Sequence, residues 1–554
     1  MTAEHTEAEI RRRRMLQLTG LGAAAGMGGL AGCTGGSDGT ETPTDEVTEA
    51  GGTVTETETE GTPVEATGKV VASHTYDPNT LDPAKYANIT DMQIANNIFD
   101  TLTDYRIGTA KLQPGLATDW EFTNGGNSIE FSLREGVQFH KGYGELTASD
   151  VEAHLERIND PDTGSPVKPS LDQLGYQGVD IEDDYSFTIN FSAPASPAPY
   201  LLGQQMGMIP PADAVEELGE DFEFNPVGAG PFEFTEFEPN TRTVITAFDD
   251  YHRDDRPKVQ TVEYRPIPES QTAWSAFRSR EIDIRRVNSS ERLQQLRGRD
   301  NVKFSEAIGL ITRFVGINTQ VEPFDNKKVR QALNYASNDR SIVESVFPGL
   351  STLSTSFVAP GVKHHTTEDV PSYDYDPEKA QQLLEEAGYG DGFETTWWVP
   401  QIGRFTSPAT VFQNNWSEVG IDVNVEIKEV GSYVSTIFGS EHEIPLFIHS
   451  LGQDPVPDAF LYDSFHSNAW GPDGGNYWFY SNDDVDAWLE EATSSTDEER
   501  RAELFADIQR QITEDAPGIW IDHEKFIFPM QEYVNGFESD PMRRMEMETT
   551  SVDK

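Results

Sequence analysis

Alternating apolar and polar positions predict strands at several points along the chain. A strict alternation is the pattern of a strand with one buried face. It is carried by Ile129, Phe131 and Leu133, then by Phe187, Ile189 and Phe191, and again by Val423, Val425 and Ile427. The apolar run 444–450 and the segment 393–399 predict two more strands, of which the first is suited to full burial.

Helices are predicted from a different spacing and from their end signals. Thr147 with Asp150 three positions later resembles a capping box before an apolar stripe. Asp376-Pro377 supplies a cap and a first-turn proline for a second helix, and Gly388 can end it in the left-handed conformation. A third helix is predicted from about Asp325 to Val343. Strands and helices are therefore mixed throughout, which predicts an α/β protein with mixed sheets and no internal repeat.

The N-terminal 33 residues have the layout of an export signal. Four consecutive arginines, 11–14, precede a Gly/Ala-rich apolar run, and Arg12-Arg13-x-Met15-Leu16 resembles the twin-arginine pattern. Leu30-Ala31-Gly32-Cys33 resembles a lipobox, and Cys33 is the single cysteine of the chain. We therefore expect lipidation at Cys33, although an amphipathic helix with an incidental thiol is the alternative. Residues 34–68 hold nine acids and no Lys or Arg, which predicts a disordered Thr/Gly-rich linker.

The strong excess of acidic residues indicates the environment in which the protein works. The 554 residues include 95 acids against 41 bases, of which 14 are Lys and 27 are Arg, giving a formal charge of −54. A lysine-poor acidic surface resembles adaptation to very high salt, where the Debye length falls to about 3 Å at 1 M. A surface that gathers cationic ligands is the alternative. The negative charge argues against a nucleic-acid partner. The sequence contains no run of 18 apolar residues, so no membrane-spanning helix is predicted.

Motifs of catalysis and metal binding are mostly absent from the sequence. It has no HExxH, no Walker loop and no GxGxxG outside the export segment. His364 and His365 would point to opposite faces of a strand, so no metal site is expected. We therefore expect no catalytic residue, no cofactor and no enzyme, although triads assembled from distant residues leave a hydrolase open as an alternative.

Several separated segments together resemble the family 5 extracellular solute-binding proteins of ABC transporters, which bind dipeptides, oligopeptides or nickel. Each segment alone is a weak signal, but their order over roughly residues 70–430, behind a lipoprotein signal, is specific. The segments are Asp77-Pro78-Asn79-Thr80-Leu81-Asp82-Pro83, Leu116-Ala117-Thr118-Asp119-Trp120, Phe131-Ser132-Leu133-Arg134-Glu135-Gly136-Val137, Gly228-Ala229-Gly230-Pro231-Phe232, Val329-Arg330-Gln331-Ala332-Leu333-Asn334-Tyr335-Ala336 and Tyr375-Asp376-Pro377-Glu378-Lys379-Ala380.

The resemblance implies a two-lobed fold of the periplasmic-binding-protein (Venus flytrap) type, closing around a solute in the cleft between the lobes. An extra subdomain is then inserted in the first lobe. The implied division is lobe I from 69–100, 226–311 and 524–554, the inserted subdomain from 101–225, and lobe II from 312–523.

Site residues are predicted at the carboxyl ends of strands, where α/β sheets bind ligands. In the family's peptide binders an aspartate after one strand takes the peptide's amino group. Asp454 is the nearest match here, with Asp458 as the runner-up and a residue capping its own turn as the alternative. Arg404, in the loop expected after 393–399, matches the arginine that holds the ligand's carboxylate. Trp398 and Tyr76 are candidates for lining the cleft, with core packing as the alternative.

The resemblance implies a monomeric receptor, lipid-anchored on the extracellular face of the cell membrane. It would capture a peptide or similar small charged solute and present it to the transmembrane subunits of an ABC permease. Binders of nickel chelates or of other small solutes share the same fold. An exported hydrolase and a surface-layer protein are the alternatives from other classes.

Overall fold

The computed structural model describes residues 65–439, 443–471 and 474–554. The predicted twin-arginine segment, Cys33 and the linker as far as residue 64 lie outside the described residues. Their predictions therefore stay predictions.

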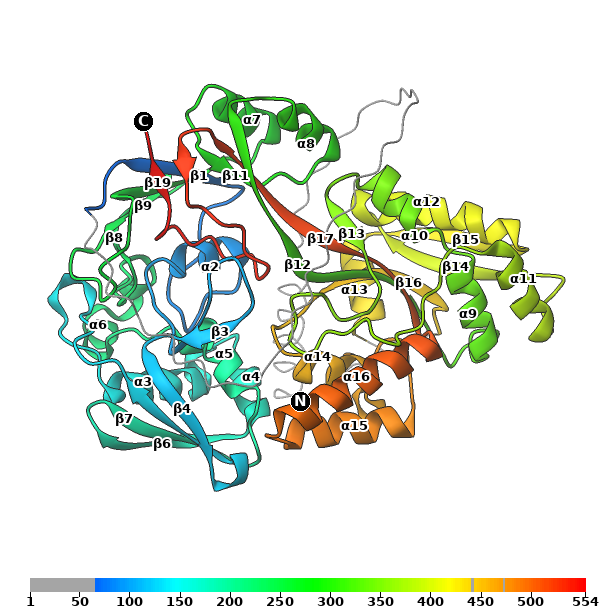
Figure 1. Ribbon diagram of the computed structural model, residues 1–554, viewed down its shortest axis with the longest axis horizontal. Helices are drawn as coiled ribbons and strands as arrows, with labels where there is room; N and C mark the ends of the chain where they lie inside the picture. The colour runs from blue at the N-terminus through cyan, green and yellow to red at the C-terminus, as the bar shows by residue number, and fades with distance from the viewer. Residues whose placement is uncertain (1–64, 440–442, 472–473) are drawn as a thin grey trace.

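One large mixed sheet runs through both halves of the molecule (Figure 1). Parallel pairs join β14 to β15 and β1 to β10, whereas β12 is antiparallel to both of its neighbours. The predicted mixed sheet is thus confirmed. In spatial order the strands are β15 (Ile421–Lys428), β14 (Phe393–Pro400), β16 (Leu446–Gly452), β12 (Val302–Ile317), β17 (Gly518–Gln531), β11 (Ile284–Arg285), β1 (Lys69–His74), β10 (Thr261–Pro266), β9 (Arg242–Ala247) and β8 (Phe232–Glu238), with β13 (Ser351–Leu353) paired to the side of β17.

Strands β12 and β17 cross from one lobe to the other (Figure 1). The 16 residues of β12 rise about 3.3 Å each, so it spans roughly 50 Å. At one end Val302 pairs with Gln531 in lobe I, and at the other Gly316 pairs with Gly518 in lobe II. The register shifts between Ile308 and Thr312, and such irregularities bend and twist a strand. The fold is therefore two-lobed, as predicted, with a pair of crossover strands between the lobes.

Lobe I comprises the elements before β12 and the chain after β17. Its core gathers around β1, β8, β9 and β10, and Phe526 and Phe528 of β17 pack into it. A separate four-stranded sheet has the order β4-β5-β7-β6, and apart from Ala84 and Ala229 the residues of its core fall within 101–225. The remaining elements are β2 (Thr103–Tyr105), β3 (Leu112–Pro114), β4 (Ala117–Thr123), β5 (Ser128–Leu133), β6 (Tyr176–Asp183), β7 (Ser186–Phe191), β18 (Val534–Asn535), β19 (Ser551–Val552), α2 (Ile89–Ala95), α3 (Ala148–Asn159), α4 (Lys168–Leu174), α5 (Ala198–Leu201), α6 (Ala212–Leu218), α7 (Ser270–Arg278) and α8 (Ser290–Arg297).

In lobe II, helices pack against both faces of the sheet. Trp397 is buried in the core formed with α9, α11 and α12, whereas Trp398 packs against the core formed with α14, α15 and α16. The two adjacent tryptophans therefore point to opposite faces, as successive residues of a strand do. The helices are α9 (Lys327–Tyr335), α10 (Asp339–Ser341), α11 (Pro377–Glu386), α12 (Gly403–Glu418), α13 (Val430–Ile437), α14 (Asp458–Phe465), α15 (Asp483–Ser494) and α16 (Glu498–Asp515).

Two predicted helix starts are confirmed in detail. The capping box of α3 is present, with the Thr147 backbone N–H donating to Asp150 Oδ2 at 3.0 Å. Asp376 caps α11 by accepting from the Lys379 N–H at 2.9 Å, and Gly388 follows that helix with φ of 89°. These ends depend on contacts three or four residues apart, so the sequence is enough to place them.

The predicted helix from Asp325 to Val343 is wrong as one element. Helix α9 ends at Tyr335, and a new turn begins after Asn338, whose side chain accepts from the Ser341 N–H at 3.0 Å. Ser337 Oγ also donates to the Leu333 carbonyl. Short polar side chains bond nearby backbone groups in this way and so compete with a continuous helix.

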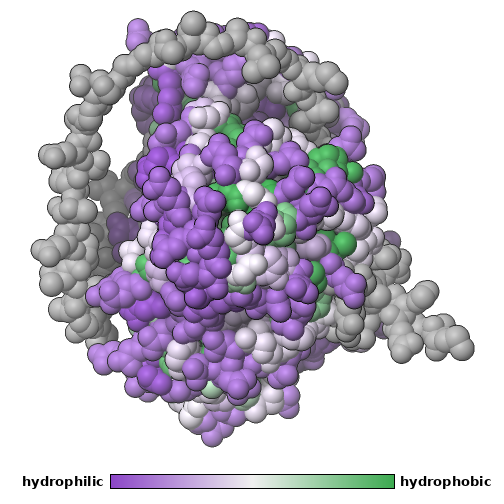
Figure 2. Space-filling model, turned by 90° about the vertical axis from the view of Figure 1, so that its right-hand side faces the viewer, coloured by the Kyte–Doolittle hydropathy of each residue, from purple (hydrophilic) through white to green (hydrophobic). Residues whose placement is uncertain are grey.

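The face of the molecule shown in Figure 2 is predominantly hydrophilic. Figure 2 shows the lobe II side of the molecule, on which hydrophobic residues form small separate patches. Within the described ranges, no helix combines the length and the apolar character needed to cross a bilayer.

Candidate functional site

Two of the predicted site residues follow neighbouring parallel strands. Trp397 and Trp398 of β14 pair in register with Leu446 and Phe447 of β16, so the carboxyl ends of both strands lie at one edge of the sheet. Arg404 follows β14, and Asp454 follows β16. The tertiary structure thus brings to one edge two residues that are 50 positions apart in the chain.

Asp454 lies near the opposite lobe. Tyr105 lies on β2 of lobe I, and the pKa of its hydroxyl is raised well above its ordinary value. Burial is the largest cause, and the negative charge of Asp454 is the second. Tyr105 donates to the Tyr200 carbonyl at 2.6 Å, which fixes the ring. Asp454 is half-buried, in the loop between β16 and α14. It therefore stands where the two lobes approach each other.

Arg404 lies in the first turn of α12, whereas the sequence predicted a loop. Its guanidinium carbon is 5.0 Å from the centre of the Phe405 ring. Burial lowers the pKa of Arg404, the carboxylate of Glu524 opposes that shift, and the nearby charges of Arg313 and Arg286 add to it. A cation in the first turn of a helix also faces the positive end of the helix dipole. Arg404 is thus a partly desolvated cation with a carboxylate and two further arginines nearby.

Asp458 is engaged in the interior of lobe II. It is 3% exposed, and Arg501 Nη1 and Nη2 donate to its two oxygens at 2.9 Å each. This fork-to-fork pair fixes α14 against α16. Of the two candidate aspartates, Asp454 is the one near the other lobe.

The two aromatic candidates occupy different environments. Trp398 is half-buried, with Lys428 Nζ 4.0 Å from the centre of its ring. Tyr76 follows β1 and is 54% exposed, so its ring is accessible to a solute.

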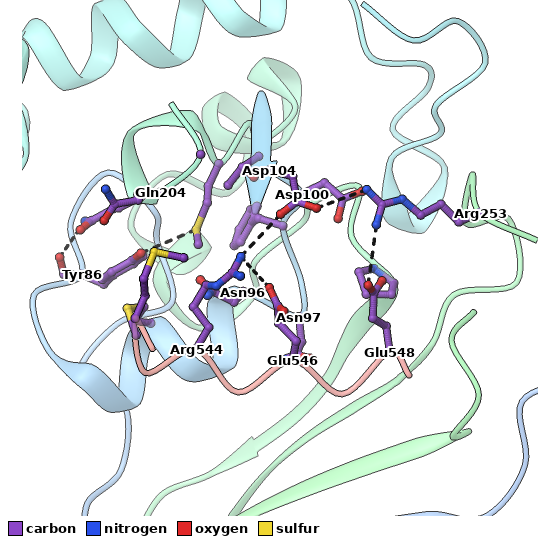
Figure 3. A pocket seen from close by; sticks show the side chains of 18 residues that line it. Tyr86, Asn96, Asn97, Asp100, Asp104, Gln204, Arg253, Arg544, Glu546 and Glu548 are labelled. Carbon is purple, nitrogen blue, oxygen red and sulfur yellow. Dashed lines mark hydrogen bonds and ion pairs between the residues drawn. The ribbon is translucent and has the colours of Figure 1, made fainter. Parts of the chain in front are cut away.

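A cavity of about 140 Å³ lies in lobe I and is lined by apolar side chains such as Phe99 and Met208 together with charged ones. Figure 3 shows Arg544, on the tail after β17, reaching toward the acids that line the cavity. Arg544 Nη1 lies 2.8 Å from Glu546 Oε1 and 3.5 Å from Asp104 Oδ1. The guanidinium carbon of Arg544 is 5.5 Å from the centre of the Tyr105 ring. Burial raises the pKa of Glu546 well above its ordinary value.

Sequence reasoning missed this cavity. Asp104 and Arg544 are separated by 440 positions and belong to no motif. Charged residues are also common everywhere in this chain, so their presence near its end carried no signal.

Comparisons with known proteins agree with this architecture. The model of a family described as bacterial extracellular solute-binding proteins, family 5 Middle, matches residues 111–472. The dipeptide-binding protein of Escherichia coli is 27% identical over 482 residues, which cover 82% of this chain and 89% of that protein. Heme-binding protein A of Haemophilus influenzae is 29% identical, covering 83% of this chain and 87% of that protein.

Solved structures give the same result for the fold. HbpA2 from Haemophilus parasuis superposes with a TM-score of 0.81 at 24% identity, covering 88% of this chain and 100% of that one. The periplasmic binding protein DppA from Helicobacter pylori, in complex with the peptide STSA, has a TM-score of 0.71 at 26% identity, covering 88% of this chain and 99% of that one.

Proposed function

Because the chain belongs to the family 5 extracellular solute-binding proteins, we propose that it captures a peptide or similar small charged solute between its two lobes. It then presents the solute to the transmembrane subunits of an ABC permease and releases it unaltered. Closure of the lobes about the β12–β17 crossover is the motion that encloses the solute.

The observation that carries this proposal is the pair Asp454 and Arg404 at one edge of the lobe II sheet. A carboxylate and a guanidinium at that edge suit the two ends of a zwitterion, because the first takes an ammonium and the second binds a carboxylate with its planar fork. Tyr105 of lobe I lies near Asp454, and its hydroxyl donates to the Tyr200 carbonyl. The related dipeptide-binding protein and the peptide-bound relative support a peptide as the solute.

A ligand search in high salt tests this function. Mass spectrometry of the purified protein should find a co-purifying small molecule, and a thermal-shift screen of short peptides should find a match. A ligand at 100 times its dissociation constant adds about 2.7 kcal/mol of stability, which raises the melting temperature by a few degrees in a protein of this size. Failure of every peptide to bind, or steady conversion of a peptide to products, would contradict the proposal, and the second result would favour the hydrolase.

Membrane attachment through Cys33 is part of the same proposal. Cleavage before Cys33 and its lipidation would leave the acidic segment 34–68 as a tether between the membrane and the monomeric folded body. Each buried CH2 of a lipid contributes about 0.8 kcal/mol to membrane binding, so stable anchoring requires a second chain or signal besides one acyl chain.

Cys33→Ser should move the protein from the membrane fraction to the medium. Immunoblotting of fractionated cells that express the full chain measures the change. A variant with Arg12 and Arg13 both replaced by lysine is the control, because it should instead stay inside the cell. Retention of Cys33→Ser on the outer face of the membrane would refute lipid anchoring at this residue.

A further inference from the structure

Four arginines converge where the two lobes meet. Arg286 follows β11 in lobe I, Arg313 lies on the crossover strand β12, Arg404 begins α12 in lobe II, and Arg543 belongs to the tail after β17. All four act on the same carboxyl group, Glu524 of β17: burial alone would raise its pKa, but the four positive charges lower it. The arginines therefore share one small region, although they come from both lobes.

The carboxylates in this region are too few to balance the arginines. Arg286 Nη2 donates to Glu524 Oε1 at 2.6 Å. Arg313 lies opposite Asp522 in the β12–β17 register, with its Nη1 3.4 Å from Asp522 Oδ2. Burial raises the pKa of Asp522, and the charge of Arg313 opposes that shift. Burial and the charge of Asp522 together raise the pKa of Asp339 well above its ordinary value. Four arginines face these three carboxyl groups, so the group has a net positive charge even when all three are ionised.

Hydrogen-bond donors in the group are left over. Arg313 is 5% exposed, and among the described residues its Nε has no hydrogen-bond partner. The same holds for the buried Nε of Arg286, although a third of that side chain is exposed. Burying an unpaired donor of a charged group costs free energy, and an anion could satisfy it. The partial exposure of Arg286 and Glu524 gives a solute access.

The arginine planes are held by aromatic rings. The guanidinium carbons of Arg286 and Arg543 lie 4.6 and 5.3 Å from the centre of the Phe526 ring. That of Arg313 lies 4.0 Å from the Phe347 ring. Cation–π contacts of this kind orient a guanidinium without neutralising it. The donors are thus positioned before any ligand arrives.

Helix α12 begins near the same region, because Arg404, a member of the arginine group, lies in its first turn. It is 16 residues long, and Ile402 at its N-cap supplies no side-chain hydrogen bond. The partial positive charge of a helix N-terminus favours an anion. Arg404 in its first turn adds a full positive charge to that end. An anionic ligand would relieve the unfavourable approach of these positive groups.

We propose that Arg286, Arg313 and Arg543 extend the Arg404 contact into a subsite for a solute with two or more carboxylates at one end, such as a peptide whose last residue is Asp or Glu. This inference rests on the proposed function for the position of the solute. It adds a substrate class, because a single carboxylate held by Arg404 would not reach the Nε donors of Arg286 and Arg313, which have no hydrogen-bond partner among the described residues. The subsite stands out in a chain whose formal charge is −54.

A pair of isosteric peptides tests the subsite. Isothermal titration with Ala-Glu and Ala-Gln in molar salt should show at least about tenfold tighter binding of Ala-Glu. Arg313→Gln and Arg286→Gln should each remove most of that preference while leaving the affinity for Ala-Gln within about twofold. Of the two substitutions, Arg286→Gln is expected to disturb folding less, because the Arg286 side chain is partly exposed. Arg280→Gln, which alters an exposed pair with Glu532, is the matched control and should keep the preference.

The outcomes separate this inference from the proposed function. Equal binding of the two peptides, or a preference that survives both arginine variants, would overturn the subsite but leave a peptide receptor. If neither peptide binds, the peptide function fails, and citrate then serves as the probe of the subsite. Citrate binding that is lost in Arg313→Gln and Arg286→Gln would support the subsite, and no citrate binding would overturn it.

Discussion

Replacing Asp454 or Arg404 by alanine is expected to weaken solute binding by on the order of 2–5 kcal/mol, which is roughly thirtyfold to several thousandfold. Each side chain is partly removed from water, so its loss leaves one charge of the solute enclosed without a partner. Isothermal titration in molar salt, with the ligand found by mass spectrometry, measures the change. The melting temperature of the ligand-free protein should change little, because neither residue belongs to a hydrophobic core cluster.

Conservative variants sharpen this prediction. Arg404→Lys keeps the charge but loses the planar fork, so it should recover only part of the affinity lost in Arg404→Ala. Asp454→Asn keeps the shape but loses the charge, so it should bind nearly as weakly as Asp454→Ala if the partner is an ammonium. Affinity equal to that of the wild type in both alanine variants would remove these residues from the site and, with them, the main support for a zwitterion clamp.

The largest loss of stability is expected from breaking the Asp458–Arg501 pair. The two side chains are 2% and 1% exposed, and two hydrogen bonds of 2.9 Å join them. Removing one partner of a buried ion pair leaves an uncompensated charge and costs about 3–5 kcal/mol. Arg501→Ala should therefore lower the urea midpoint strongly, and Asp458→Ala should do the same.

The neighbouring residue offers a matched control. Arg500 pairs with Glu491 at 2.7 Å, but both side chains are more than 40% exposed. Surface pairs contribute about 0–1 kcal/mol, so Arg500→Ala should barely shift the midpoint. Equal effects of Arg500→Ala and Arg501→Ala would contradict the assigned role of the buried pair. The double variant Asp458→Ala/Arg501→Ala should lose less stability than the two single variants added together, because it leaves no unpaired charge.

Local elements could be predicted from sequence wherever the signal lies within a few residues. The alternation in β5 and β7 places Ile129, Phe131, Phe187 and Ile189 in the interior, where each is at most 2% exposed. The same alternation also predicted β15, but Ile427, near its end, is 50% exposed, since β15 is the edge strand of the sheet. Periodicity identifies a strand, and the neighbours of that strand decide which of its positions are covered.

The candidate site was accessible to sequence reasoning in part. Asp454 and Arg404 follow strands that were predicted, and parallel strands bring their carboxyl ends to one edge. The helical position of Arg404 was missed, because no capping residue announces the start of α12. Nothing near Asp458 indicated its partner, since Arg501 is 43 positions away on another helix.

The order of strands and helices, the acidic composition and the two-lobed family resemblance were all present in the linear chain, because they depend on neighbouring residues or on summed charge. The arginine group was not. Arg286, Arg313, Arg404 and Arg543 are spread over more than 250 positions and meet because β12 and β17 cross between the lobes. Long-range convergence of this kind is set by sheet order and strand register, which a single sequence does not encode in any local pattern.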